Sequence, residues 1–317
     1  MSTEIPEPLH EVEDYVYDEV PTTATGRMAH IGVLRETNSY NIFTTEGSEL
    51  NLASTDATTA GNEKMQRIVM FKRKQVAAER RKGKEFLRGL HENHTGSIDN
   101  DEAFGNFSDD GDLCRLHDNL CGKCIDCKLY GFANAEPNDV EGSRTSRVLT
   151  DSAFSIRGLE RRQDITFNAQ SEENERGGQS HALNSLAHAR PETFFPSIVT
   201  LRDFTYRELY WLIHLIQSTT RYGAETSRTG YVDNEVVSIW FDTRETMSNL
   251  ELSQRTRENL GEEFDELTIE DVRGAMMEAI PRSEVDIDSL KQDIGGELSG
   301  DSAQIEFLQE LHQSQTG

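Results

Sequence analysis

The 317-residue sequence has no run of apolar residues long enough to cross a membrane. No window approaches about 18 uncharged apolar residues, which excludes a spanning helix. The first twenty residues are acidic and do not have the basic-then-apolar order of a secretory signal, so we expect a soluble, cytoplasmic protein with no membrane partner. Cysteine is also scarce, and this compartment disfavours disulfides among the four that are present.

Positive charge is scarce as well. The chain has 57 Asp and Glu residues against 32 Lys and Arg, a formal net charge of −25, and only 8 of the basic residues are lysines. Patterned apolar runs at 194–201 and 235–241 argue against disorder. Because the acids are scattered along the chain, we interpret the acidity as halophilic adaptation, in which net charge reveals little about the ligand.

One basic segment departs from this pattern. Residues 64–88 contain ten basic and two acidic residues. A solvated helix face explains such a run, and a strip that binds a polyanion is the alternative. In concentrated salt, counterion release contributes little to the free energy of binding. Phosphate binding then depends on hydrogen bonds of defined geometry. The excess of arginine suits this, because a guanidinium binds phosphate bidentately. The phosphate-binding candidates in this strip are Lys72, Arg73, Lys74, Arg80, Arg81 and Lys84.

The order of the predicted elements indicates an α+β fold on an antiparallel sheet. A βαββαβ core with large insertions is the simplest version. Strands are predicted at 27–35, near 148–149, at 194–201 and at 235–241. Helices are predicted from 72 to about 92, and from a capping box at Thr205 and Glu208 to a closing Gly223.

The domain boundaries follow shifts in composition. An acidic and irregular arm is expected first, and a loosely packed or partner-dependent acidic region last. The segments are an arm at 1–25, a core at 26–250 and a tail at 251–317, with a loop at 36–63, a cysteine-bearing insertion at 93–140 and an exposed flap at 165–192.

The cysteines fall within fourteen residues in the spacing C-x6-C-x2-C-x2-C. They are Cys114, Cys121, Cys124 and Cys127. Gaps of two residues let a tight turn point successive thiolates at one ion, so we predict a tetrahedral zinc site, with an iron–sulfur cluster or no metal as alternatives. Four thiolates leave no open coordination position, so the metal is structural. Lys123 and Lys128 are expected to offset part of its negative charge.

Several stretches in one consistent order resemble a known family. They are MAHIGVLRETNSYNIFTTEG, FKRKQVAAERRKGKEFLR, CGKCIDCKLYGFA, SRVLTDSAFS, ETFFPSIVTLRD and TRYGAETSRTGYVDNEVV. Together, over roughly residues 27–252, they are similar to the backbone subunit of type I-D CRISPR effector complexes, in the Cas-seven-like branch of the RAMP superfamily. The resemblance implies an RRM-like palm with a zinc-binding insertion and a protruding thumb. It also implies antiviral defence and these partners: CRISPR RNA, other copies of the chain along it, the target DNA strand, the large subunit and a smaller RAMP-like subunit.

A guide of any sequence has to be held by its backbone, because base pairing reads the sequence. Two further segments suit that task. Arg144 and Arg147 flank a Thr-Ser pair before a strand, with salt bridges on an acidic surface as the alternative. In the loop after the second helix, glycines permit close approach to a ligand, whereas an ordinary helix-to-strand connector is the alternative. The candidates there are Arg221, Tyr222, Gly223, Ser227, Arg228 and Gly230; Tyr222 and Tyr231 could stack on bases, although such aromatics are more often core.

Two other functional classes stay open. Some relatives of this fold cut nucleic acid with a loop Asp after the first strand, and Glu46, Glu49 and Asp56 lie in the corresponding segment. Metal-dependent cleavage needs carboxylates against the scissile phosphate, but on so acidic a surface a loop acid is usually just solvated. The other class is a zinc-stabilised adaptor that binds only protein through the basic strip. A cysteine-based redox enzyme would instead require reactive thiols that survive metal removal.

Overall fold

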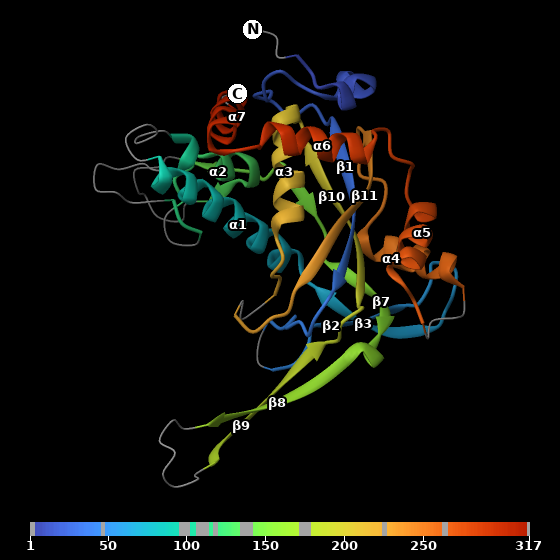
Figure 1. Ribbon diagram of the computed structural model, residues 1–317. Helices are drawn as coiled ribbons and strands as arrows, with labels where there is room; N and C mark the ends of the chain where they lie inside the picture. Colours follow the sequence, from blue (N-terminus) through green and yellow to red (C-terminus); the bar gives the residue numbers. More distant parts are fainter. Residues whose placement is uncertain are drawn as a thin grey trace.

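The computed structural model shows a central sheet flanked by helices, from which a long two-stranded hairpin projects (Figure 1). It describes residues 4–45, 48–94, 102–105, 114–116, 120–133, 142–170, 179–223, 227–261 and 266–315. Within these ranges, no helix combines the length and apolar character that crossing a membrane requires.

Four strands form the central sheet in the order β11-β1-β10-β6, and every neighbouring pair is antiparallel. Two helices connect these strands, so that the core runs β–α–β–β–α–β along the chain. The bounds are β1 Met28–Thr37, α1 Lys72–Asn93, β6 Val148–Thr150, β10 Phe194–Arg202, α3 Tyr206–Ser218 and β11 Val232–Asp242. The predicted strands and helices of the core are thus confirmed.

Alternate residues of β1 contribute to two hydrophobic cores. Ala29, Ile31 and Val33 pack on the side of α1 and α3, whereas Leu34 packs on the other side of the sheet. The capping box of α3 is present, with Thr205 accepting from the backbone N–H of Glu208. The prediction that Gly223 closes this helix is wrong, because the helix ends at Ser218 and the glycine lies in the following loop.

The C-terminal region is wrongly predicted as loosely packed. Its helices are α4 Asn249–Leu260, α5 Ile269–Ala279, α6 Ile287–Glu297 and α7 Asp301–Ser314. Leu252, Val272 and Met276 fill the second core beneath α4 and α5. Phe307 and Leu311 of α7 join the first core. A few well-spaced apolar residues are enough for each helix, since the many acids occupy the outward faces.

Part of the N-terminal arm forms a helix, although an irregular arm was expected. A 3-10 helix, η1 (Glu7–Tyr15), buries Leu9 and Val12 in the first core. The backbone N–H of Val20 donates to the carbonyl of Ser314 at 2.9 Å, so the arm and the end of α7 lie together, as Figure 1 shows.

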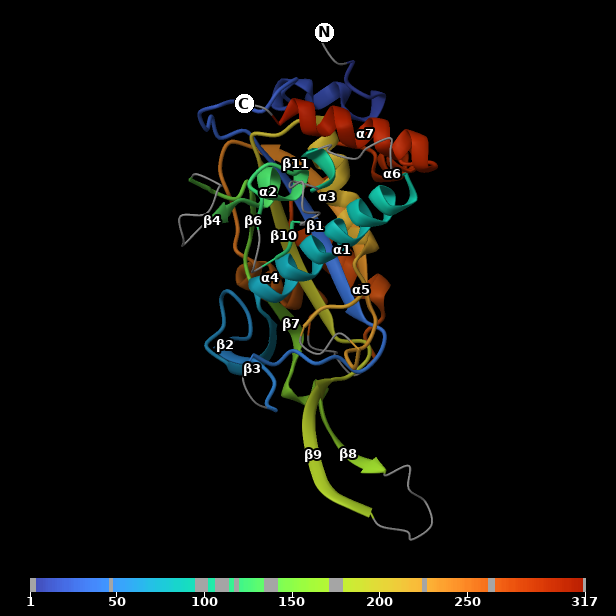
Figure 2. The ribbon, with the colours of Figure 1, turned by 90° about the vertical axis from the view of Figure 1, so that its left-hand side faces the viewer.

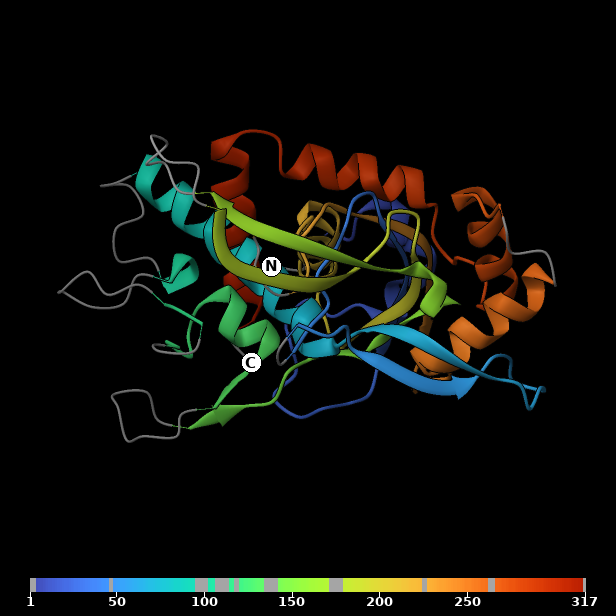
Figure 3. The same cartoon turned by 90° about the horizontal axis from the view of Figure 1, so that it is seen from below.

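The remaining elements build the periphery. A three-stranded sheet has the order β2-β3-β7, and β8 pairs with β9 in the projecting hairpin (Figure 2). Seen from below, the cysteine-bearing α2 and the pair α4 and α5 lie on opposite sides of the molecule (Figure 3). The bounds are β2 Leu52–Asp56, β3 Lys64–Met70, η2 Glu102–Phe104, α2 Ile125–Tyr130, β4 Phe132–Ala133, β5 Ser143–Arg144, β7 Ala153–Gly158, η3 Leu159–Arg161, β8 Arg162–Gln170 and β9 Gln179–Ala189.

Candidate metal centre and nucleic-acid interface

The four cysteines converge on one point and are all buried. Their sulfur atoms lie within 4.8 Å of one another, with separations of 3.6 Å for Cys114 and Cys127 and 3.7 Å for Cys121 and Cys127. A disulfide would bring two sulfurs to about 2.05 Å. A tetrahedral zinc ion with Zn–S bonds of about 2.3 Å holds its sulfurs about 3.8 Å apart. The sulfur positions therefore fit a four-thiolate metal site.

Local backbone geometry supports this site. Gly122 has a φ of 73°, which lets the chain turn tightly after Cys121. The backbone N–H groups of Lys123 and Cys124 both donate to the Cys121 sulfur at 3.3 Å. Cys127 then lies in the first turns of α2, which brings its sulfur back to the others. N–H donors of this kind orient a thiolate and stabilise its charge.

Helix α1 supplies the nearest positive charge to the cysteines. The Lys84 ammonium lies 2.9 Å from the Cys114 sulfur and 3.0 Å from the Asp126 carboxylate, and its side chain is 4% exposed. Burial disfavours its charge, but Cys124 and Asp126 outweigh burial, so the pKa of Lys84 is raised above its ordinary value. The two lysines predicted to offset the thiolate charge lie further out: Lys123 is exposed and pairs with Glu102, and Lys128 is half-buried, although both interact electrostatically with Cys121.

The basic strip therefore divides between buried and accessible positions of α1. Arg80 points inward with Lys84 and forms an ion pair with Asp126 at 2.7 Å. Lys72 and Arg73 are exposed in the first turn of the helix, Lys74 is half-buried and Arg81 is exposed further along; we call these four accessible residues the α1 basic face. The prediction of a single phosphate-binding strip is wrong for Arg80 and Lys84, because both are engaged at the cysteine site.

The α1 basic face carries concentrated charge. No carboxylate among the described residues forms an ion pair with any of its four members. Burial, followed by the like charges of Arg73 and Arg81, lowers the pKa of Lys74. These neighbouring cations repel one another, although the chain as a whole has a net charge of −25. A bound anion would relieve this repulsion and stabilise their charged forms.

The two arginines at the Thr-Ser pair have different environments. Arg147 is buried, donates to the Glu208 carboxylate at 2.6 Å and to the carbonyl of Asp203 at 2.9 Å. It joins the start of β6 to the capping box of α3, so the salt-bridge alternative holds for it. Arg144 is half-buried on β5, and burial, followed by the charge of Arg147, lowers its pKa.

The loop between α3 and β11 packs against the segment that follows β1. Tyr222 is fully buried, and its hydroxyl donates to Glu79 of α1 at 3.2 Å. Gly223 has a φ of 98°, and a Cβ there would lie 2.2 Å from the carbonyl oxygen of Ile42. A Cβ on Gly230 would lie 2.6 Å from that of Ser39. The close approach that these glycines permit is therefore to the chain itself.

Polar side chains of this loop remain on the surface. Arg221, Ser227 and Arg228 are exposed, and the Arg221 guanidinium donates to the carbonyl of Thr229 at 2.9 Å. Together with the α1 basic face they are the predicted RNA-binding residues that the structure leaves accessible.

The two candidate catalytic carboxylates that the structure describes are each engaged in an ion pair. Asp56 ends β2 and pairs with Lys64 at 2.7 Å, and Glu49 pairs with Arg162 at 2.8 Å. Glu46 lies outside the described residues. Within the described part of the chain, the cysteines are the one group of three or more ligating side chains placed to share an ion.

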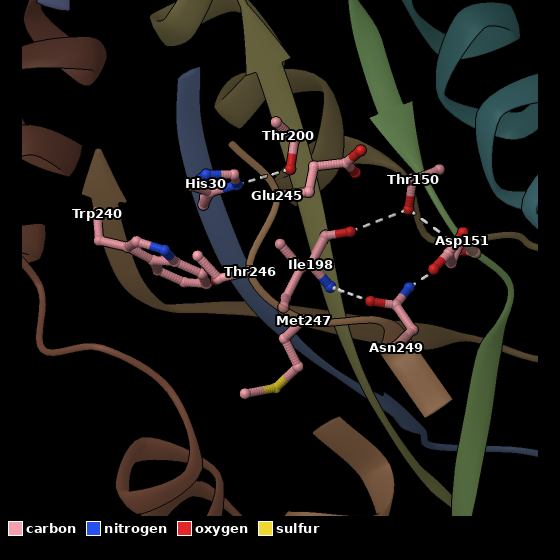
Figure 4. A pocket seen from close by; sticks show the side chains of 10 residues that line it. All are labelled: His30, Thr150, Asp151, Ile198, Thr200, Trp240, Glu245, Thr246, Met247 and Asn249. Carbon is pink, nitrogen blue, oxygen red and sulfur yellow. Dashed lines mark hydrogen bonds between the residues drawn. The ribbon is translucent and has the colours of Figure 1, made fainter. Parts of the chain in front are cut away.

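A small polar pocket on the other face of the sheet was not predicted (Figure 4). His30 hydrogen-bonds Thr200 at 2.8 Å, and the Asn249 side chain accepts from the N–H of Ile198 at 2.7 Å. The pocket has room for about one water molecule. The Asn249 contact attaches the start of α4 to the sheet. Because the lining residues are far apart in the sequence, no local pattern predicts this pocket.

Known proteins were compared with this chain. No curated protein matches. The crystal structure of Thermofilum pendens Csc2 is similar, with 16% identity, a TM-score of 0.61 and 99% of each chain covered. A chain of a "CRISPR RNA-guided surveillance complex, pre-nicking" has 9% identity and a TM-score of 0.50, covering 85% of this chain and 99% of that one. At these identities the likeness concerns the fold, which is mixed α/β with antiparallel sheets.

A family model provides the assignment. The model described as Csc2 Crispr matches residues 15–296, which is most of the chain and includes the sheet, α1 and the cysteines. The protein therefore belongs to the Csc2 CRISPR family.

Proposed function

We propose that this protein is the RNA-binding backbone subunit of a type I-D CRISPR effector complex in antiviral defence. Several copies polymerise along one CRISPR RNA and present it for pairing with the target DNA strand. The large subunit and a smaller RAMP-like subunit complete the assembly. In this role the protein holds the guide by its phosphates, so that every spacer sequence is accepted.

The observation that carries this proposal is the α1 basic face. Its four cations lie at accessible positions of one helix in a strongly acidic chain, without carboxylate partners among the described residues. A phosphate backbone supplies anions at regular intervals, and arginine forks bind phosphate bidentately. Arg221, Ser227 and Arg228 extend the proposed contact surface, and half-buried Arg144 is a peripheral member.

The architecture is consistent with this role. The strand order β11-β1-β10-β6 with crossing helices supports an RRM-like palm, and the β8–β9 hairpin suits a thumb. We propose the palm at 26–250, with the loop at 36–63, the zinc-binding insertion at 93–140 and the thumb at 165–192. The arm at 1–25 and the C-terminal region at 251–317 pack onto that palm. The dispersed acids suit a salt-rich cytoplasm.

Zinc is the metal that we propose for the four cysteines. Cys114, Cys121, Cys124 and Cys127 would hold it, and it would supply a fixed cross-link between the segments at 114–116 and 120–130 with no open position for catalysis. Lys84 balances the charge of the thiolates, and Asp126 connects them to Arg80. The insertion is thereby anchored to the helix that carries the α1 basic face.

The test is RNA binding by a charge-reversed variant. We expect R73E/K74E/R81E to bind unrelated RNA sequences more weakly by a similar factor, and the slope of log affinity against log salt to fall by about 1 for each lost phosphate contact. K82E is the matched control, because Lys82 lies on the same helix but pairs with Glu85 at 3.5 Å. A loss confined to certain sequences, or equal losses in both variants, would contradict recognition by this face.

A further inference from the structure

Two exposed tyrosines lie on backbone segments that pair with each other, the loop after β1 and the loop before β11. Tyr40 and Tyr231 are each 41% exposed. The N–H of Gly230 donates to the carbonyl of Tyr40 at 2.8 Å, and the N–H of Asn38 donates to the carbonyl of Tyr231 at 2.9 Å. Residues far apart in the sequence are thus held side by side, each with part of its ring in solvent.

The junction is rigidly built. Asn41 donates from its side chain to the carbonyl of Gly230 at 2.8 Å, and Thr229 accepts from the N–H of Ile42 at 3.1 Å. Because a Cβ on Gly230 would clash with Ser39, glycine is needed to bring the loops so close. Two exposed aromatics fixed in this way lose little conformational freedom when they bind a ligand.

The junction lies at the base of the projecting hairpin (Figure 1). The Tyr40 ring meets that of His188 of β9 edge-on, with centroids 6.4 Å apart, and Asn41 pairs with Ala189 at the end of β9. A strand that follows the α3–β11 loop toward the hairpin would therefore pass over the tyrosines.

Charge around the junction is uneven. Arg221, Ser227 and Arg228 are exposed on the loop that carries Tyr231. Beyond Tyr231, Asp233 pairs in register with Glu36, and burial together with nearby carboxylates raises the pKa of Glu36. The acidic side repels phosphate but not an uncharged base. This arrangement suits a nucleic-acid strand whose phosphates face the arginines and whose bases face the tyrosines.

We propose that Tyr40 and Tyr231 form a stacking platform for unpaired bases of single-stranded RNA. The inference rests on the proposed function and adds a contact to bases where that function requires contacts only to phosphate. Stacking is compatible with any guide, because every base offers a π-face. Tyr231 is therefore assigned to RNA, whereas buried Tyr222 belongs to the core.

The experiment compares two ligands that differ only in their bases. The full-length protein is titrated with a single-stranded RNA and with an abasic ribose-phosphate strand of equal length. Y40L/Y231L removes the aromatic faces and keeps apolar bulk, and Y40F/Y231F keeps the faces. Y17L is the control, since Tyr17 is a partly exposed aromatic of the N-terminal arm, and that arm lies at the opposite end of the molecule from the hairpin (Figure 1).

We expect Y40L/Y231L to bind RNA roughly five- to hundred-fold more weakly, with unchanged affinity for the abasic strand. Y40F/Y231F and Y17L should bind both ligands as the parent does. Unchanged RNA binding, equal losses for both ligands, or a change only in self-association would overturn the platform and leave the proposed function standing. Failure of the parent protein to bind either strand would instead overturn the proposed function.

Discussion

Neighbouring basic residues of α1 have different environments. Arg80 and Arg81 are adjacent in sequence, yet Arg80 pairs with buried Asp126 while Arg81 faces solvent. Helical periodicity alone separates the two faces, but which face is buried depends on where the cysteine segment docks. That contact joins residues 30 to 46 positions apart, so no local pattern identified Arg80 and Lys84 as inward residues.

Substitution of Lys84 tests whether this residue stabilises the cysteine site. We expect K84M to destabilise the protein by about 3 kcal/mol, because it removes one partner from a buried charge cluster around Cys114 and Asp126. Urea unfolding of K84M and of the control K82M measures the difference. Equal unfolding midpoints in these variants would show that Lys84 does not stabilise the cysteine site.

Other predictions about single residues also depended on whether their contacts are local in the sequence. The cysteine cluster could be predicted because ligands two residues apart act within one turn of chain. Gly223 and Gly230 were correctly identified as positions of close approach, but the approaching group is the segment 38–43 and not a ligand. Tyr40 was missed, because nothing local distinguishes an exposed tyrosine from a buried one.

At the scale of elements, strong patterns were reliable and weak ones were not. β10 and β11 are dense in apolar residues, and α3 begins at a capping box, so their predictions are confirmed. The helices after residue 249 have few apolar residues and many acids, which resembles a solvated tail. Helices α4 and α5 are buried on the face of the sheet that α1 and α3 leave uncovered, whereas α6 and α7 pack into the core that α1 and α3 share.

The cysteine insertion is the element whose stability depends most on a metal. We expect C124S to lose bound metal and the order of residues 114–127, while the unfolding transition of the central sheet persists, since that sheet has cores of its own. Metal analysis and hydrogen exchange measure both effects. K123S is the control, because Lys123 lies in the same turn but is exposed. Full metal content in C124S would contradict four-thiolate ligation.

At the scale of the whole molecule, an acidic exterior surrounds a small accessible group of cations. We propose that the α1 basic face, the loop with Arg221 and Arg228, and the base of the hairpin contact phosphates and bases without reading sequence. Under the proposed function, a surface of this kind would let the protein accept a guide of any sequence.

The central claim is that copies of this protein assemble on RNA. Native mass measurement of the assembly purified from its source, combined with absorbance, gives the nucleic-acid content and the number of subunits. We expect RNA of defined length bound to several copies of the chain, with unrelated guide sequences in the bound pool. An assembly free of RNA, or one copy bound to a single RNA sequence, would contradict this claim.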